Sequence, residues 1–160
     1  GILETVAGAA GGVRYIPYLG KKHAENYLTD LSSRIEDPNR ILPGGFVYLS
    51  DILGNTQDLR RIGELIATRY AYSDVDAVMT VETKGIALAQ AVARYLDVPF
   101  VIARKRSKVT EGATVSVNYI SSSLDRVSKM ELPTRALKKD SNVLIVDDFM
   151  KKSDRSHVVL

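Results

Sequence analysis

The sequence contains no cysteine and no tryptophan. Without cysteine the chain forms neither a disulfide nor a thiolate metal site, which suits a reducing cytoplasm. No stretch approaches the roughly 18 consecutive apolar residues of a membrane span, so we expect no membrane partner. The first residues lack the basic and apolar regions of a secretory signal. The chain starts at Gly1 rather than at a methionine, so we expect a fragment of a longer protein.

The composition is that of an ordinary globular protein. The 160 residues are 45% hydrophobic and 26% charged, enough for one domain with its own core. The net charge of +3 is small. It allows an anionic partner but is weak evidence for nucleic-acid binding by itself.

The chain is organised around an apolar run that ends in two acids. Residues 143–146 are apolar and mostly β-branched, which predicts a strand covered on both faces, as in a parallel sheet. Asp147 and Asp148 follow where that strand should end, and ligands of open α/β sheets sit beyond such ends. Paired acids there can accept hydrogen bonds from a sugar diol, hold a hydrated Mg²⁺, or cap the next helix. The residues alone leave these alternatives open.

A second strand is followed by a short loop that contains a lysine and a glycine. Residues 75–81 predict a strand, 86–96 a helix and 100–103 another strand, which implies a right-handed parallel crossover. In the loop between the first strand and the helix, Lys84 and Gly85 suit an anion held at a helix N-terminus. A structural turn explains them equally well.

Four cations lie within residues 104–108, directly after the strand at 100–103. Such a run is usually a solvated surface, but its position at a strand's carboxyl end favours an anion site. Residues 114–120 and 126–132 then alternate in polarity, which predicts an antiparallel flap.

The first seventy residues predict two hairpin-like turns and two helices. Residues 1–16 resemble a hairpin with a glycine-rich tip, and 22–35 a connector helix that packs on the sheet domain. The proline and glycines at 43–45 predict a tight turn, after which Phe46 and Tyr48 are core or hood residues or, as a minority alternative, stack on a base. Apolar spacing then predicts a helix that ends near Tyr70.

Residues 41–54, 83–86, 104–120 and 143–150 together resemble the purine operon repressor family of Gram-positive bacteria. Those regulators carry a type I phosphoribosyltransferase fold and use it to sense phosphoribosyl pyrophosphate (PRPP) without catalysis. The resemblance implies an α/β fold, with a parallel sheet, flanking helices and an antiparallel flap, that is C-terminally truncated. It divides the chain into a remnant wing of a winged-helix DNA-binding domain at 1–16, a connector and hood at 17–73, and an incomplete effector-binding domain at 74–160.

The resemblance also implies roles for particular residues. The acidic pair would bind the ribose hydroxyls, directly or through Mg²⁺, and the basic groups would face the pyrophosphate arm. Arg14 would contact DNA phosphate in the full-length protein, which would be a homodimer. The implied PRPP-binding residues are Asp147, Asp148, Phe149, Lys151, Thr83, Lys84, Gly85, Arg104, Lys105 and Lys108.

The last ten residues depart from this pattern. The family follows its acidic pair with a glycine-containing loop that cradles the 5′-phosphate, whereas residues 151–160 contain no glycine. Three hypotheses are therefore carried forward. The favoured one is a DNA-binding, PRPP-sensing regulator of purine genes that is not an enzyme. The alternatives are a working purine phosphoribosyltransferase and a fragment that has lost both activities.

Overall fold

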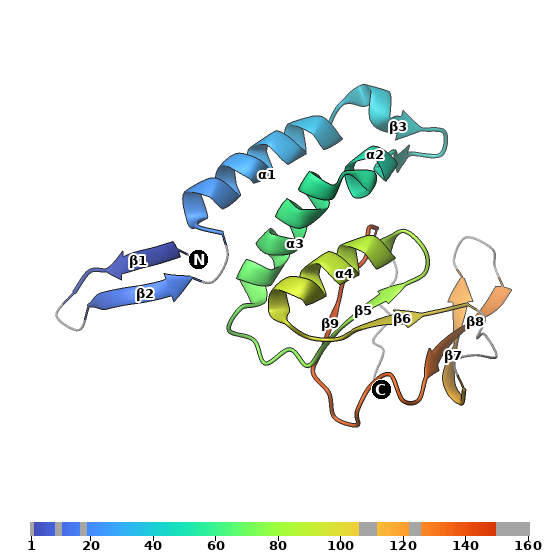
Figure 1. Cartoon of the computed structure of the whole chain (residues 1–160). Helices are drawn as coiled ribbons and strands as arrows, with labels where there is room; N and C mark the ends of the chain where they lie inside the picture. Colours follow the sequence, from blue (N-terminus) through green and yellow to red (C-terminus); the bar gives the residue numbers. More distant parts are fainter. Residues whose placement is uncertain (1, 9–10, 17–18, 106–111, 122–125, 150–160) are drawn as a thin grey trace.

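The structure is a computed structural model that describes residues 2–8, 11–16, 19–105, 112–121 and 126–149. Its centre is a three-stranded parallel sheet with the order β6-β5-β9 (Figure 1). The elements in chain order are β1 (Ile2–Val6), β2 (Gly12–Ile16), α1 (Lys21–Ile35), the 3₁₀ turn η1 (Pro38–Arg40), β3 (Ile41–Leu42), β4 (Phe46–Val47), α2 (Ser50–Gly54), α3 (Thr56–Tyr70), β5 (Ala77–Val81), α4 (Gly85–Leu96), β6 (Phe100–Ala103), β7 (Thr114–Ser121), β8 (Arg126–Pro133) and β9 (Val143–Ile145).

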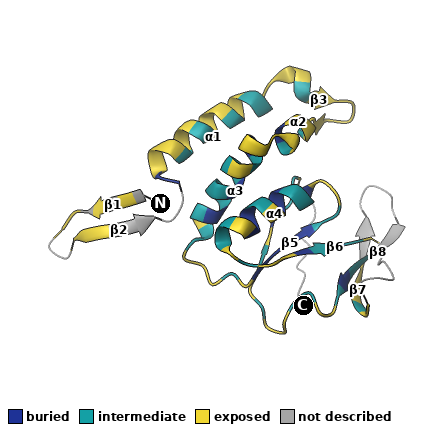
Figure 2. Cartoon of the chain, viewed as in Figure 1, coloured by how far each residue is buried: buried dark blue, intermediate teal, exposed yellow. Residues whose placement is uncertain are grey.

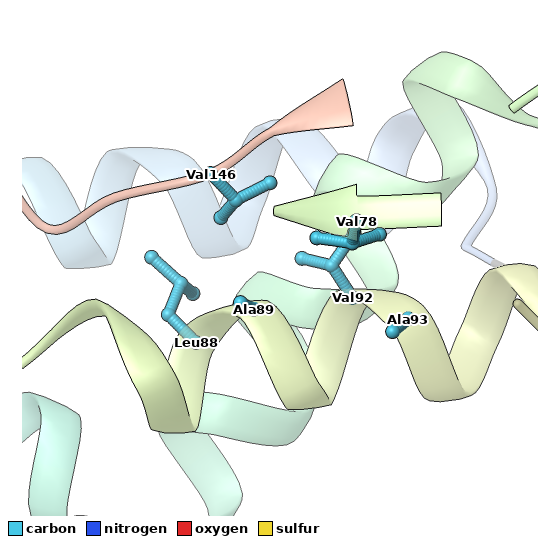
Figure 3. Close-up of a cluster of buried hydrophobic side chains, with 6 residues drawn as sticks. All are labelled: Val78, Leu88, Ala89, Val92, Ala93 and Val146. Atoms are coloured by element: carbon cyan, nitrogen blue, oxygen red, sulfur yellow. The ribbon is translucent and has the colours of Figure 1, made fainter. Parts of the chain in front are cut away.

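The central strand β5 sends alternate side chains into two apolar clusters. Val78 joins Leu88, Ala89, Val92 and Val146 in a cluster between the sheet and α4 (Figure 3). Apolar residues of α3 pack against the same cluster.

Helices α3 and α4 approach closely at a glycine. A Cβ atom added to Gly63 of α3 would lie 2.9 Å from the backbone carbon and oxygen of Ala91 on α4. Only a residue without a side chain lets the two helices pack at this distance. The two helices are therefore in direct contact at this position.

The second cluster lies on the opposite face of the sheet. Ala77 and Met79 of β5 meet Leu132 of β8 there, together with apolar residues of the turn that follows β8. Backbone hydrogen bonds in both directions join Arg104 to Glu131, which ties the β7–β8 hairpin to the end of β6. The predicted antiparallel flap is confirmed, with β7 and β8 paired from Thr114↔Pro133 to Ser121↔Arg126.

Helix α1 has the predicted extent but not the predicted packing. It runs alongside α3 rather than on the sheet, and none of its residues is buried (Figures 1 and 2). Its contact with α3 is polar: Arg34 donates to both carboxylate oxygens of Asp58 at 2.6 and 3.0 Å, and the Tyr27 hydroxyl donates to the same carboxylate at 2.9 Å. The prediction that α1 packs on the sheet domain was based on its apolar stripe. Part of that stripe faces solvent, and Leu28 is 51% exposed.

Two predicted turns are present as hairpins. β1 pairs antiparallel with β2, and Glu4 lies opposite Arg14 in the register. The side chain of Arg14 lies outside the described part, so its DNA contact stays a prediction. β3 and β4 form the second hairpin, whose turn residues Gly44 and Gly45 have φ of 86° and 77°, a conformation that favours glycine.

The residues after that second turn are exposed. Phe46 is 61% and Tyr48 is 45% exposed, so the core alternative for these two residues is wrong, and the hood and base-stacking alternatives stay predictions. The strand prediction for 143–146 is also corrected in part. β9 pairs with β5, but Ile145 is 47% exposed, because within the described residues β9 has a neighbour on one side only. Among the described helices, none is long and apolar enough to cross a membrane.

Candidate functional site

The candidate site lies at the carboxyl edge of the sheet. The three strands are parallel, so their carboxyl ends meet at one edge, together with the loops that follow them. The Val146 N–H donates to the Met79 carbonyl at 2.8 Å, which extends the ladder one residue beyond β9. Val146 is buried, and Asp147 is the first residue beyond the end of the strand pairing.

The Asp147 carboxylate lies directly against the first residue of α4. A Cβ atom added to Gly85 would overlap Oδ1 of Asp147 and the hydroxyl of Thr80, and would lie 3.2 Å from Cγ of Asp147. The carboxylate also accepts a hydrogen bond from the Asp148 N–H at 2.9 Å. Gly85 is thus required for close approach between the helix and the acid, two segments that lie 62 positions apart in the sequence.

This environment disfavours the charged form of Asp147. Burial raises the pKa of its carboxyl from 3.8 to about 6, and the neighbouring Asp148 carboxylate adds to the rise, while the Asp148 N–H opposes it. A carboxyl half-buried beside a second acid is a common feature of ligand-binding sites, because a ligand or metal supplies the missing compensation.

The loop between β5 and α4 presents polar groups to solvent at the same edge. Thr83 and Lys84 are exposed, whereas Gly85 is buried, and the Glu82–Thr83 peptide bond is cis. Lys84 stands at the N-cap of α4 and makes no side-chain capping bond. No side chain therefore caps this twelve-residue helix, although its Ile86 N–H lies 3.4 Å from the Thr83 carbonyl, and a helix N-terminus of this kind suits an anion.

Glu82 connects that loop to the basic segment after β6. One oxygen of its carboxylate accepts from the Lys105 N–H at 2.9 Å, and the other lies 3.3 Å from Nη1 of Arg104. The Glu82 N–H in turn donates to the Ala103 carbonyl at 3.0 Å. The acidic pair, the β5–α4 loop and the start of the basic segment therefore lie at one sheet edge, as the sequence predicted.

The other predicted site residues are placed less fully. Phe149 follows the acidic pair and is 60% exposed. Lys108 and Lys151 lie outside the described residues, so their roles stay predictions. The sequence patterns predicted no role for Glu82 or Thr80, although Glu82 is the single acid in the loop directly after β5, which is a signal that the sequence does contain.

Mg²⁺ fits the acidic pair on chemical grounds, as part of a shared site. Within the described residues no group of three or more His, Asp or Glu side chains could hold a metal. Mg²⁺ usually keeps several waters and takes one or two carboxylates together with phosphate oxygens of a ligand. Asp147 and Asp148 match that requirement.

Similarity to known proteins shows the family to which the chain belongs. The family model described as a phosphoribosyl transferase domain matches residues 49–153, more than half of the chain. The chain belongs to this family. Within it, the chain is 55% identical over 151 residues to the purine biosynthesis transcriptional repressor PurR of Bacillus subtilis, a match that covers 94% of this chain and 53% of that protein. It is 53% identical over 151 residues to the purine biosynthesis transcriptional activator PurR of Lactococcus lactis, covering 94% of this chain and 56% of that protein.

The resemblance to purine regulators is therefore confirmed, and so is the fold. A solved adenine phosphoribosyltransferase from Rhodothermus marinus superposes with a TM-score of 0.61 at 25% identity, covering 76% of this chain and 68% of that one. The chain spans about half the length of the two purine regulators that it matches.

Proposed function

We propose that this chain is the effector-binding part of a DNA-binding regulator of purine biosynthesis genes, and that its effector is PRPP. The observation that carries the proposal is the contact of Asp147 with Gly85. It places a carboxyl whose pKa is raised by burial at the point where the sheet edge meets the N-terminus of α4, which has no side-chain cap. The relatives named as purine regulators supply the class of function.

In this proposal each part of the site takes one part of the ligand. The carboxylates of Asp147 and Asp148 accept hydrogen bonds from the 2- and 3-hydroxyls of the ribose, with Mg²⁺ shared between carboxylate and ligand oxygens. Thr83, Lys84 and the first turn of α4 donate to the pyrophosphate arm. The ligand acts as a switch if it binds the DNA-competent and DNA-incompetent states with different affinities.

Calorimetric titration of the chain with PRPP and Mg²⁺ tests the ligand. We expect saturable binding by the natural sequence and loss of that heat in Asp147→Asn/Asp148→Asn. The matched control is Glu25→Gln/Asp30→Asn, which removes two exposed acids from α1 and should bind as the natural sequence does. Equal heats from the site variant and the natural sequence would refute the assignment of the acidic pair.

The enzymatic alternative rests on the similarity to adenine phosphoribosyltransferase. It predicts that PRPP and a purine base are converted to a nucleotide and pyrophosphate in the presence of Mg²⁺. We propose that the chain binds PRPP without this reaction. Chromatography after incubation with adenine, guanine, hypoxanthine and xanthine in turn tests the point, and formation of any nucleotide would favour the enzyme.

A further inference from the structure

Glu82 is the one acidic residue in the loop that is proposed to meet the pyrophosphate. Its two carboxylate oxygens are used by two different donors, the Lys105 N–H at 2.9 Å and Nη1 of Arg104 at 3.3 Å. The side chains of Arg104 and Glu82 are 22% and 27% exposed. The pair is therefore largely shielded from water, and its attraction is stronger than that of a surface ion pair.

The position of this carboxylate matters because of what Arg104 would otherwise bind. A guanidinium recognises carboxylate and phosphate oxygens with the same planar array of donors. A phosphate oxygen that approaches Arg104 therefore either takes the Nη1 donor from Glu82 or binds another N–H of the guanidinium with the Glu82 carboxylate beside it. In the second case two negative charges lie side by side on one cation, which their mutual repulsion disfavours.

We propose that Glu82 is an internal counter-ion of the pyrophosphate subsite, and that a ligand must displace its carboxylate from Arg104 in order to bind. This inference rests on the proposed function. Glu82 is a positioning residue in this scheme: it holds Arg104 and Lys105, the start of the basic segment, against the β5–α4 loop while no ligand is bound. A singly charged anion gains too little to displace it, whereas a pyrophosphate group carries enough charge to do so.

The variant Glu82→Gln tests the proposal with inorganic pyrophosphate as the probe, measured by calorimetry with and without Mg²⁺. Glutamine keeps an oxygen that can accept from the Lys105 N–H but removes the competing charge. We expect pyrophosphate to bind roughly three- to fivefold more tightly, and we expect this gain to shrink as salt screens the pair. A carboxylate with a merely structural role would give weaker binding on removal.

Two further variants identify the cause of the change. In the Arg104→Gln background, Glu82→Gln should give no gain, because the guanidinium for which they compete is absent. Glu64→Gln removes the same charge from α3, where Glu64 pairs with Arg61 at 3.2 Å, and should leave pyrophosphate affinity unchanged. Should Glu82→Gln fail to fold, Glu82→Asp shortens the side chain and keeps its charge, and we expect a smaller gain in the same direction.

The outcomes separate this inference from the function on which it rests. Unchanged or weaker pyrophosphate binding by Glu82→Gln, or a gain that persists without Arg104, overturns the counter-ion role while PRPP binding by the natural sequence stands. If the natural sequence binds neither PRPP nor pyrophosphate, the proposed function fails and the inference fails with it.

Discussion

Replacing Asp147 with asparagine should stabilise the chain at neutral pH while it removes ligand binding. The folded-state pKa of Asp147, about 6, lies above its ordinary value of 3.8, so the folded chain holds this proton more tightly than the unfolded chain does. The stability that the protonated carboxyl contributes is fully present below pH 4 and is lost as the pH rises through 6. Above that range the charged carboxylate destabilises the fold, and asparagine does not.

The size of the effect follows from the shift. A change of roughly two pKa units corresponds to at most about 3 kcal/mol. Asp147 is only half-buried and lies at the positive end of the α4 dipole, so solvent screening and the dipole reduce this to roughly 1 kcal/mol. Asparagine also keeps an oxygen for the Asp148 N–H, so that hydrogen bond need not be lost.

Urea unfolding followed by far-ultraviolet circular dichroism at pH 4 and pH 7.5 measures this difference. We expect Asp147→Asn to match the natural sequence at pH 4 and to exceed its unfolding free energy by roughly 1 kcal/mol at pH 7.5. Glu25→Gln, an exposed position on α1, corrects for the change in net charge. A variant that is less stable at pH 7.5, or a gain of equal size at both pH values, would refute the reasoning.

Three further changes test packing and the link between α1 and α3. Gly85→Ala should cost roughly 1–3 kcal/mol of unfolding free energy and abolish PRPP binding in calorimetry, because its methyl group would overlap the carboxylate and hydroxyl beside it; unchanged stability would contradict the close approach. Gly63→Ala should lower the urea midpoint despite alanine's better helix propensity, since the methyl group meets the backbone of Ala91 at 2.9 Å; a raised midpoint would refute this. Asp58→Asn should cost about 2 kcal/mol at pH 7, less than a fully buried pair because Arg34 is 36% exposed. The pKa of Asp58 is lowered mainly by its hydrogen bonds from Arg34, so the loss should shrink as pH falls below 4, and a loss independent of pH would contradict it.

Local sequence patterns predicted the order and type of the elements well. The apolar periodicity and the turn residues between elements placed the helices at 22–35 and 86–96 within one residue of α1 and α4, and the strand at 100–103 coincides with β6. Because the carboxyl ends of parallel strands meet at one edge of a sheet, the sequence also predicted that Asp147 and Gly85 lie at the same edge. These features depend on neighbours in the sequence, which is why a single sequence reveals them.

The features that the sequence did not reveal all depend on distant residues. Asp58 looks like an ordinary polar position on a helix, yet it is 8% exposed and joins α1 to α3 through Arg34 and Tyr27. Gly63 carries no motif, and its role appears only where α4 crosses it. The exposure of α1 and of Ile145 likewise reflects which surfaces the rest of the chain covers, and periodicity within one element cannot specify that.

The two halves of the candidate site differ in whether their charged groups already have a partner of opposite charge. This difference affects which ligands the site can bind. At the end of β9 no cation of the described residues is recorded in an ion pair with the acids, and burial raises the pKa of Asp147. At the end of β6 the cation Arg104 is already paired with Glu82. A neutral sugar would gain from the first half only, and a simple anion would have to break the pair in the second half while it meets two acids in the first. A molecule that presents hydroxyl donors to the acids and a multiply charged group to the cations, with Mg²⁺ between them, would gain from both halves at once, and the proposed effector PRPP has both kinds of group.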